Sequence, residues 1–111
     1  MIVATALEPD GTIGHAWGKA DMVAVARMAD GQILDWQEHR VGWGRSHDQG
    51  THGSHHARVA TFLREQGVEM VLAHHAGDGM RRMLGSMGLR LVEGVGGDAR
   101  AAMVAAAGGR T

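Results

Sequence analysis

The chain has 111 residues, of which 44% are hydrophobic and 21% charged, a balance typical of one globular domain and not of a disordered chain. Lys and Arg number 11 against 12 Asp and Glu, and the formal net charge of -1 provides no basic field for nucleic acid or an anionic membrane surface. No apolar run approaches membrane length and the amino terminus lacks the basic flank of a secretory signal, so we expect a cytoplasmic protein.

The first third of the chain is predicted to be rich in strands. Residues 2–7 form a short apolar run that contains β-branched side chains and stops at the Pro-containing turn 8–11, which indicates a buried strand. Two further strand-like runs, 22–28 and 32–38, flank Ala29-Asp30-Gly31. Asp-Gly between two such runs is a strong signal for a β-hairpin.

The middle of the chain combines an irregular segment with a helix. Residues 41–53 show neither helical nor strand periodicity, and they are rich in Gly and His, so we expect a long mobile loop of a length usually kept for function. Ser54 can cap a helix that runs to about Gln66 and places Val59, Phe62 and Leu63 on one stripe. Gly67 is then expected to end that helix in a left-handed conformation.

The last third predicts an alternation of strands and helices. Residues 68–74 and 89–93 indicate strands, residues 98–107 indicate a helix, and a further helix carries the apolar stripe of Met80, Met83, Leu84 and Met87 and ends at Gly88. The order of elements predicts a single α/β domain over residues 1–111. Its five strands and about three helices would form one mixed sheet with parallel, right-handed crossovers in its second half.

Histidine is the most informative residue type. The chain has eight histidines and no cysteine, and His47, His52, His55 and His56 lie within one stretch of eleven residues. Neutral imidazole is a common ligand of zinc, copper, nickel and iron, so this stretch indicates a site that handles a metal or a metal cluster. Because the chain lacks thiolates, a soft metal would have to arrive with its own sulfur. The competing interpretation is a solvated loop that binds stray divalent ions weakly.

A ligand is expected outside the carboxyl ends of the parallel strands, where the turns 8–11, 74–79 and 94–98 should meet. Glycines in two of these turns allow close approach of the backbone, and the following helices present unpaired N–H groups. The predicted guest is therefore an anion, bound at Gly77, Gly79, Gly96 and Gly97. Asp78 and Asp98 would compete for the same N–H groups if they act as helix N-caps.

The candidate metal ligands are the histidines expected near this edge, namely His15, His52, His55, His56, His74 and His75. The first turn of a helix disfavours imidazolium, which would keep the rings of His55 and His56 neutral. Adjacent strand-end residues point to opposite faces, so at most one of His74 and His75 is expected to face the pocket. The other unusual residues have simpler interpretations. The methionines are expected to pack in the core, and Arg81-Arg82 to lie on a solvated helix face. Trp17, Trp36 and Trp43 are expected in the core or the pocket wall, and Trp43 is the one that could cover a ligand.

The order of these motifs resembles the dinitrogenase iron-molybdenum cofactor biosynthesis family, whose small domains carry or insert metal-sulfur clusters. The resemblance runs nearly end to end, through Ile2–Thr5, Gly14–Ala20, Asp30-Gly31, Ser54–Ala57, Gly67–Ala73 and Gly77–Gly79. It implies an RNase H-like fold, cluster binding without catalysis, and histidines of the loops as ligands. His74-His75 stands where many relatives have Gly-Gly, and the cysteine of some relatives has no counterpart here.

The leading hypothesis is a non-enzymatic carrier of a metal-sulfur cluster of the iron-molybdenum type for cofactor assembly, working as a monomer or weak homodimer between donor and acceptor proteins. One alternative is a zinc, nickel or copper buffer that uses the histidine loop alone. A second alternative is a magnesium-dependent, RNase H-like phosphoryl-transfer enzyme that would use the carboxylates of Glu8, Asp10, Asp78 and Asp98.

Overall fold

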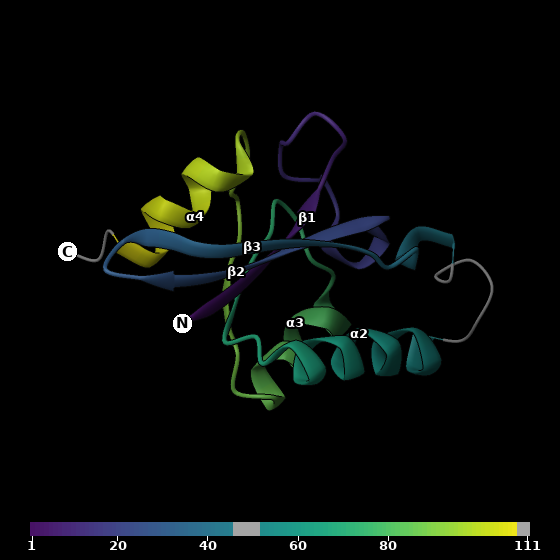
Figure 1. Cartoon of the computed structure of the whole chain (residues 1–111). Helices are drawn as coiled ribbons and strands as arrows, with labels where there is room; N and C mark the ends of the chain where they lie inside the picture. The colour runs from purple at the N-terminus through teal and green to yellow at the C-terminus, as the bar shows by residue number, and fades with distance from the viewer. Residues whose placement is uncertain (46–51, 109–111) are drawn as a thin grey trace.

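A five-stranded mixed sheet of strand order β3-β2-β1-β4-β5 forms the centre of the molecule in the computed structural model, which describes residues 1–45 and 52–108 (Figure 1). β1 pairs antiparallel with β2 and parallel with β4, β2 pairs antiparallel with β3, and β4 pairs parallel with β5. This arrangement confirms the predicted mixed sheet. The strands are β1 (Ile2–Leu7), β2 (Met22–Ala29), β3 (Gln32–Arg40), β4 (Met70–Leu72) and β5 (Arg90–Val92).

The hairpin between β2 and β3 turns at the predicted Asp-Gly pair. Asp30 and Gly31 both have positive φ, 53° and 74°, as a two-residue type I′ turn requires. The turn sets the pairing of Ala29 with Gln32, and a bulge between Arg27 and Met28 then shifts the register so that Met22 pairs with Arg40.

Helices cover both faces of the sheet, so the domain has three layers (Figure 1). α2 (His52–Gln66) and α3 (Asp78–Ser86) lie on one face, and α4 (Ala99–Gly108) lies on the other. A short 3-10 helix, η1 (Trp17–Lys19), precedes β2. Gly67 and Gly88 follow α2 and α3 with φ values of 68° and 76°, which confirms the predicted left-handed helix ends.

The sheet residues alternate between two cores, as strand geometry requires. Along β4, Met70 and Leu72 face the α4 core together with Met103, whereas Val71 faces the core under α2 and α3. The methionine stripe of α3 packs as predicted, because Met80 is buried and Met83 and Met87 lie against the same core. The larger core holds Val59 and Leu63 of α2, both fully buried, and the partly buried Phe62.

Two details of the predicted loop over residues 41–53 are wrong. α2 begins at His52, three residues earlier than a Ser54 N-cap predicts, so Ser54 is its third residue and not its N-cap. Residues 43–45 are helical, and Trp43 is only 3% exposed because its ring packs edge-on against Trp17 and Phe62. Trp43 is therefore part of the core and covers no ligand. Residues 46–51, including His47, lie outside the described residues.

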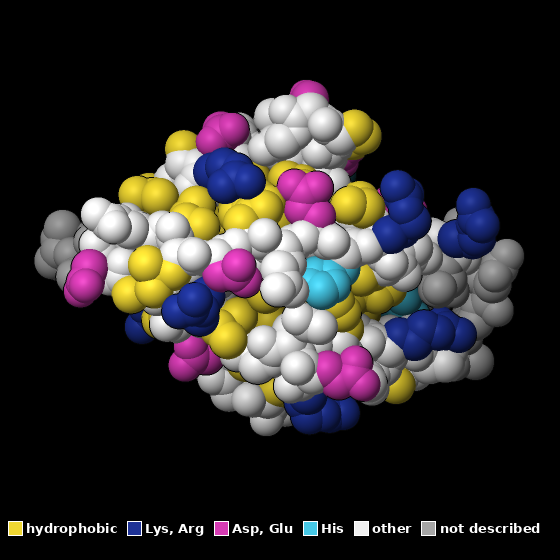
Figure 2. Space-filling view, in the orientation of Figure 1, with side chains coloured by type: hydrophobic (Ala, Val, Ile, Leu, Met, Phe, Trp, Pro, Cys, Tyr) yellow, Lys and Arg dark blue, Asp and Glu magenta, His cyan; other side chains and the backbone are white. Residues whose placement is uncertain are grey.

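The molecular surface mixes both signs of charge. Figure 2 shows Lys and Arg side chains interspersed with Asp and Glu on one face, with no large field of a single sign. This distribution agrees with the nearly balanced sequence charge. Within the described residues, no helix is both long and apolar enough to cross a membrane.

Candidate functional site

A cavity of about 430 Å³ opens at the carboxyl edge of the sheet, where a ligand was expected. Three segments that are distant in sequence form its walls: the loop and 3-10 turn before β2, the first turns of α2, and the connection from β4 into α3. The lining residues are His15, Ala16, Gly18, Lys19, His55, His56, His75, Ala76, Gly77, Asp78, Gly79 and Met80.

The histidines of the first and third segments lie side by side. The ring centroid of His15 is 4.9 Å from that of His74 and 6.3 Å from that of His75. Backbone pairing fixes this approach, because the Trp17 N–H donates to the His75 carbonyl at 3.0 Å and Ala16 forms a parallel bridge with His75. All three histidines are solvent-exposed, and of the adjacent pair only His75 lines the cavity.

The histidines of α2 reach the same cavity from the other side. His55 is 2% exposed and His56 is partly exposed, and their ring centroids are 5.9 Å apart. Two glycines make room for these rings: a Cβ placed on Gly79 would lie 2.8 Å from His56 Cε1, and one on Gly18 would lie 3.4 Å from His55 Nε2. Glycine at position 79 therefore allows the first turn of α3 to touch the His56 ring.

The N-termini of α3 and α4 differ in how their backbone N–H groups are satisfied. Asp98 caps α4, because its Oδ2 accepts the Ala101 N–H at 2.9 Å, while the Ala99 N–H donates to the Gly11 carbonyl. The N-cap of α3 is Gly77, which makes no side-chain cap hydrogen bond. The first residues of α3, from Asp78 to Met80, line the cavity, and a helix N-terminus without a side-chain cap is the kind that binds anions.

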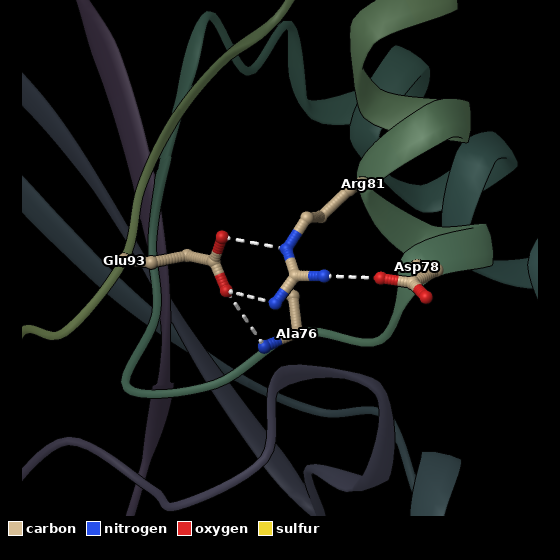
Figure 3. Close-up of polar contacts among 4 residues, drawn as sticks. All are labelled: Ala76, Asp78, Arg81 and Glu93. Carbon is tan, nitrogen blue, oxygen red and sulfur yellow. Dashed lines mark hydrogen bonds and ion pairs between the residues drawn. The ribbon is translucent and has the colours of Figure 1, made fainter.

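An ion-pair network lies beside this helix start (Figure 3). The Arg81 guanidinium donates from Nε and Nη2 to the two carboxylate oxygens of Glu93, at 2.7 and 3.0 Å, and from Nη1 to Asp78. Glu93 also accepts the Ala76 N–H at 3.3 Å. The hydrogen bond from Arg81 lowers the pKa of Glu93, with smaller contributions from Ala76 and from His75, and the same hydrogen bond raises the pKa of Arg81.

Arg81 and Arg82 are both exposed, as the interpretation of a solvated helix face predicted, but Arg81 also forms this ion-pair network. Arg81 is bound to two carboxylates. In the sequence, these acidic residues lie three positions before Arg81 and twelve positions after it, and this spacing was the signal that could have indicated the ion pairs. Lys19 is a second residue that the sequence analysis missed as a member of the site, although it lies within the Gly14–Ala20 motif.

The cavity brings together many, but not all, of the predicted site residues. His15, His55, His56, His75, Gly77 and Gly79 line it. His74 lies next to His15 at its rim, and a Cβ on Gly96 would be 3.9 Å from His74 Nδ1. Gly97 does not line the cavity, and its carbonyl accepts the Ile13 N–H. For His52 only the backbone, at the start of α2, is described, so its role as a ligand stays a prediction.

The histidines do not form a ready coordination sphere for a single ion. Over residues 1–45 and 52–108, no group of three or more His, Asp or Glu side chains is positioned to hold one metal ion. The chain also has no cysteine to bind iron directly. Among the described residues, the cavity therefore offers imidazoles, the Lys19 ammonium and a helix N-terminus, but no ready set of three side-chain ligands for a bare cation.

Three of the four carboxylates considered for magnesium chemistry, those of Asp10, Asp78 and Asp98, make other contacts. Asp10 accepts hydrogen bonds from the hydroxyl and the N–H of Thr12, which lower its pKa, Asp98 caps α4, and Asp78 binds Arg81. These contacts hold the three carboxylates in separate turns. They give no support to a two-metal phosphoryl-transfer site.

Comparison with solved structures identifies similar folds. PH0822 is 19% identical with a TM-score of 0.79, and the match covers 99% of this chain and 93% of that one. The mj0327 protein of Methanocaldococcus jannaschii, provisionally named a dinitrogenase, is 10% identical with a TM-score of 0.68 and coverages of 95% and 86%. TM1290 of Thermotoga, provisionally named a NifB protein, is 20% identical with a TM-score of 0.71 and coverages of 98% and 89%. At these identities the likeness concerns the fold alone.

Sequence comparison assigns the family. No curated protein matches the chain. The sequence profile of the family described as "Dinitrogenase iron-molybdenum cofactor" matches residues 1–109, which is nearly the whole chain. The chain therefore belongs to the dinitrogenase iron-molybdenum cofactor family.

Proposed function

We propose that the protein binds an anionic metal-sulfur cluster of the iron-molybdenum type in the cavity between η1, α2 and α3, and carries it from a donor to an acceptor protein during cofactor assembly. The observation that carries this proposal is the composition of the cavity wall. Imidazoles from three segments, the Lys19 ammonium and the start of α3, which has no side-chain cap, line one space. Among the described residues Asp78 is the single lining carboxylate, and Arg81 binds it.

Each of these groups favours a ligand of the proposed chemistry. A cluster that brings its own sulfide needs few protein ligands, and imidazole nitrogens can bind its exposed metal atoms. Backbone N–H groups and Lys19 favour its negative charge. The exposure of His15, His74 and His75 suits a cargo that has to be received and released. The family assignment supports a role in cofactor biosynthesis.

We also propose that the protein is not an enzyme and that its fold is RNase H-like. The sheet order and strand directions support the fold assignment, but a shared fold does not imply nuclease chemistry. The alternative of a zinc, nickel or copper buffer in the histidine loop depends on residues 46–51, which lie outside the described part of the chain. A metal buffer that uses only the histidine loop would not require the cavity for binding.

The test is anaerobic binding of tetrathiomolybdate, a small anion of molybdenum and sulfide, followed by gel filtration and elemental analysis of the protein. The wild-type chain should retain molybdenum. A variant with His15→Ala and His75→Ala should bind at least about tenfold more weakly, the scale of loss seen when a metal site loses supporting groups. Both residues are exposed, so the variant should fold normally.

The matched control is His39→Gln, which removes a histidine of β3 that packs against Phe62 at 5.3 Å and does not line the cavity. Its affinity should equal that of the wild type. Equal binding by the double variant and the control, or no retention by the wild type, would refute the proposed site. Zinc binding by a peptide of residues 44–57 with the affinity of the whole protein would favour the buffer.

A further inference from the structure

Arg81 lies between two carboxylates that come from different parts of the fold (Figure 3). Asp78 is the first residue of α3 and Glu93 follows β5, and the guanidinium reaches both from the second turn of α3. Glu93 is bound bidentately, through both of its oxygens. The Asp78 side chain is 81% exposed with this ion pair in place, so loss of Arg81 would remove the compensation of its charge without changing its access to solvent much.

Both carboxylates belong to the surroundings of the cavity. Asp78 lines it, and Glu93 accepts the Ala76 N–H in the same loop that carries His75. Glu93 also lies near enough to His75 for the imidazole to contribute to its pKa shift. Without the guanidinium, the charges of both carboxylates would be uncompensated near His75, although the described residues form no ready three-ligand site for a metal ion. Oxygen and imidazole donors of this kind bind divalent cations such as zinc and manganese.

We propose that Arg81 determines which charge class of ligand the cavity accepts, by occupying Asp78 and Glu93 so that the rim favours an anionic metal-sulfur species over a bare divalent cation. This inference rests on the proposed function and names a selectivity residue for it. An arginine suits the task because its planar guanidinium can bind two carboxylates at once, whereas a lysine ammonium is a single point charge.

The experiment compares Arg81→Gln with Arg82→Gln in the full chain. Arg82 is the neighbouring residue on α3, it is exposed, and it makes no ion pair within the described residues, so both variants change the net charge equally. Calorimetry with tetrathiomolybdate and, separately, with Zn²⁺ gives the two affinities. Arg81→Gln should weaken binding of the anion about tenfold, which is the scale of the interaction between unit charges a few ångströms apart at a partly screened rim. It should strengthen binding of Zn²⁺ at least about threefold.

The control, Arg82→Gln, should change the affinity for either ligand by less than about twofold, because an exposed charge away from the site is screened. Equal effects of the two substitutions would overturn the proposal, since net charge alone would then explain them. Arg81→Lys provides a variant with the charge retained, and it should shift both affinities in the same directions by a smaller factor. If Arg81→Gln does not fold, unchanged affinities in Arg81→Lys would overturn the proposal.

Failure of the carrier function can be recognised separately. A wild-type protein that does not bind tetrathiomolybdate refutes the carrier proposal, whatever Arg81 does. The Zn²⁺ measurement still decides the role of Arg81 in that case: stronger binding to Arg81→Gln than to Arg82→Gln supports exclusion of cations, and equal binding overturns it.

Discussion

At the scale of single residues, the contact between Gly79 and His56 lets α3 approach α2 at the cavity. A Cβ at position 79 would lie 2.8 Å from His56 Cε1, so Gly79→Ala has to displace the imidazole. Alanine is favoured over glycine in a helix by up to about 1 kcal/mol, which should offset the cost of moving a flexible side chain. We therefore expect unchanged stability but about threefold to tenfold weaker tetrathiomolybdate binding, given the sensitivity of metal sites to ligand position.

The control for this prediction is Gly85→Ala in the same helix, where a Cβ would meet nothing within 4 Å. It should raise the free energy of unfolding by a few tenths to about 1 kcal/mol, measured by urea denaturation, and leave binding unchanged. Wild-type affinity in Gly79→Ala would show that the position of His56 does not matter for the ligand.

Single residues of the site were predictable from the sequence only where local rules decide. The alternation of strand residues indicated that at most one of His74 and His75 faces the pocket, but the choice of His75 depends on its pairing with the loop before β2. The partner of Arg81 was not predictable either. Glu93 follows β5 whereas Arg81 lies on α3, and these two residues, twelve positions apart, come together only through the packing of α3 beside β5.

At the scale of elements, α3 and α4 show that two helix starts on one sheet edge can have different roles. Asp98 satisfies the N-terminus of α4, whereas Gly77 leaves that of α3 open. Gly77 has φ -73° and ψ 165°, a conformation that any residue can adopt, so glycine is not required there by the backbone. Glycine therefore omits a cap that the backbone would allow, which we expect to cost some stability and to leave the helix end open to the proposed ligand.

The substitution Gly77→Asp tests this idea, because aspartate is a better N-cap than glycine by a few tenths of a kcal/mol and also interacts favourably with the helix dipole. The free energy of unfolding should rise slightly. Affinity for tetrathiomolybdate should fall about tenfold, since the new carboxylate competes for the N–H groups and repels the anion. Urea denaturation and calorimetry on the same samples measure the two effects.

Gly77→Ala separates these effects from a simple loss of glycine, because a Cβ at this position meets nothing within 4 Å. It should bind the anion like the wild type. If Gly77→Asp also binds like the wild type, the N-terminus of α3 takes no part in binding.

Elements were predicted well where local chemistry defines their ends. β1 has its predicted bounds, and the positive φ values of Asp30 and Gly31 match the predicted hairpin turn. The start of α2 was missed because Ser54 is a good capping residue in isolation, and the helix begins at His52 all the same. Trp43 was placed in a loop because its burial against Trp17 and Phe62 depends on contacts distant in sequence.

At the scale of the whole molecule, the sheet topology assembles the site from distant parts of the sequence. β1 pairs with β4 in a register that places Val3 opposite Met70, 67 residues later in the chain. This pairing brings the loop after β1 beside the loop after β4. The bridge of Ala16 to His75 joins these two loops, and that of Thr12 to Asp98 joins the loop after β1 to the residue before α4. The parallel order of the second half was predictable, and these bridges were not.

The same edge should make the stability of the fold depend on pH through Glu93. Its pKa lies below the ordinary value of 4.5, chiefly because of the hydrogen bond from Arg81, so the carboxylate is more acidic in the folded than in the unfolded chain. A group of this kind contributes stability that is fully present above its unfolded pKa and is lost as the pH falls through the folded pKa. The contribution should therefore be constant near neutrality and disappear below pH 4.5.

The measurement is urea denaturation of wild type and Glu93→Gln between pH 7 and pH 3. Wild type should be more stable near neutrality, and the difference should shrink as the pH falls below 4.5, because protonated Glu93 then resembles glutamine. Glu65→Gln is the control: Glu65 is exposed on α2 and makes no hydrogen bond or ion pair within the described residues, so that variant should follow the wild-type curve. A difference between wild type and Glu93→Gln that stays constant with pH would contradict the coupling, since the ion pair with Arg81 can stabilise the edge only while Glu93 is charged.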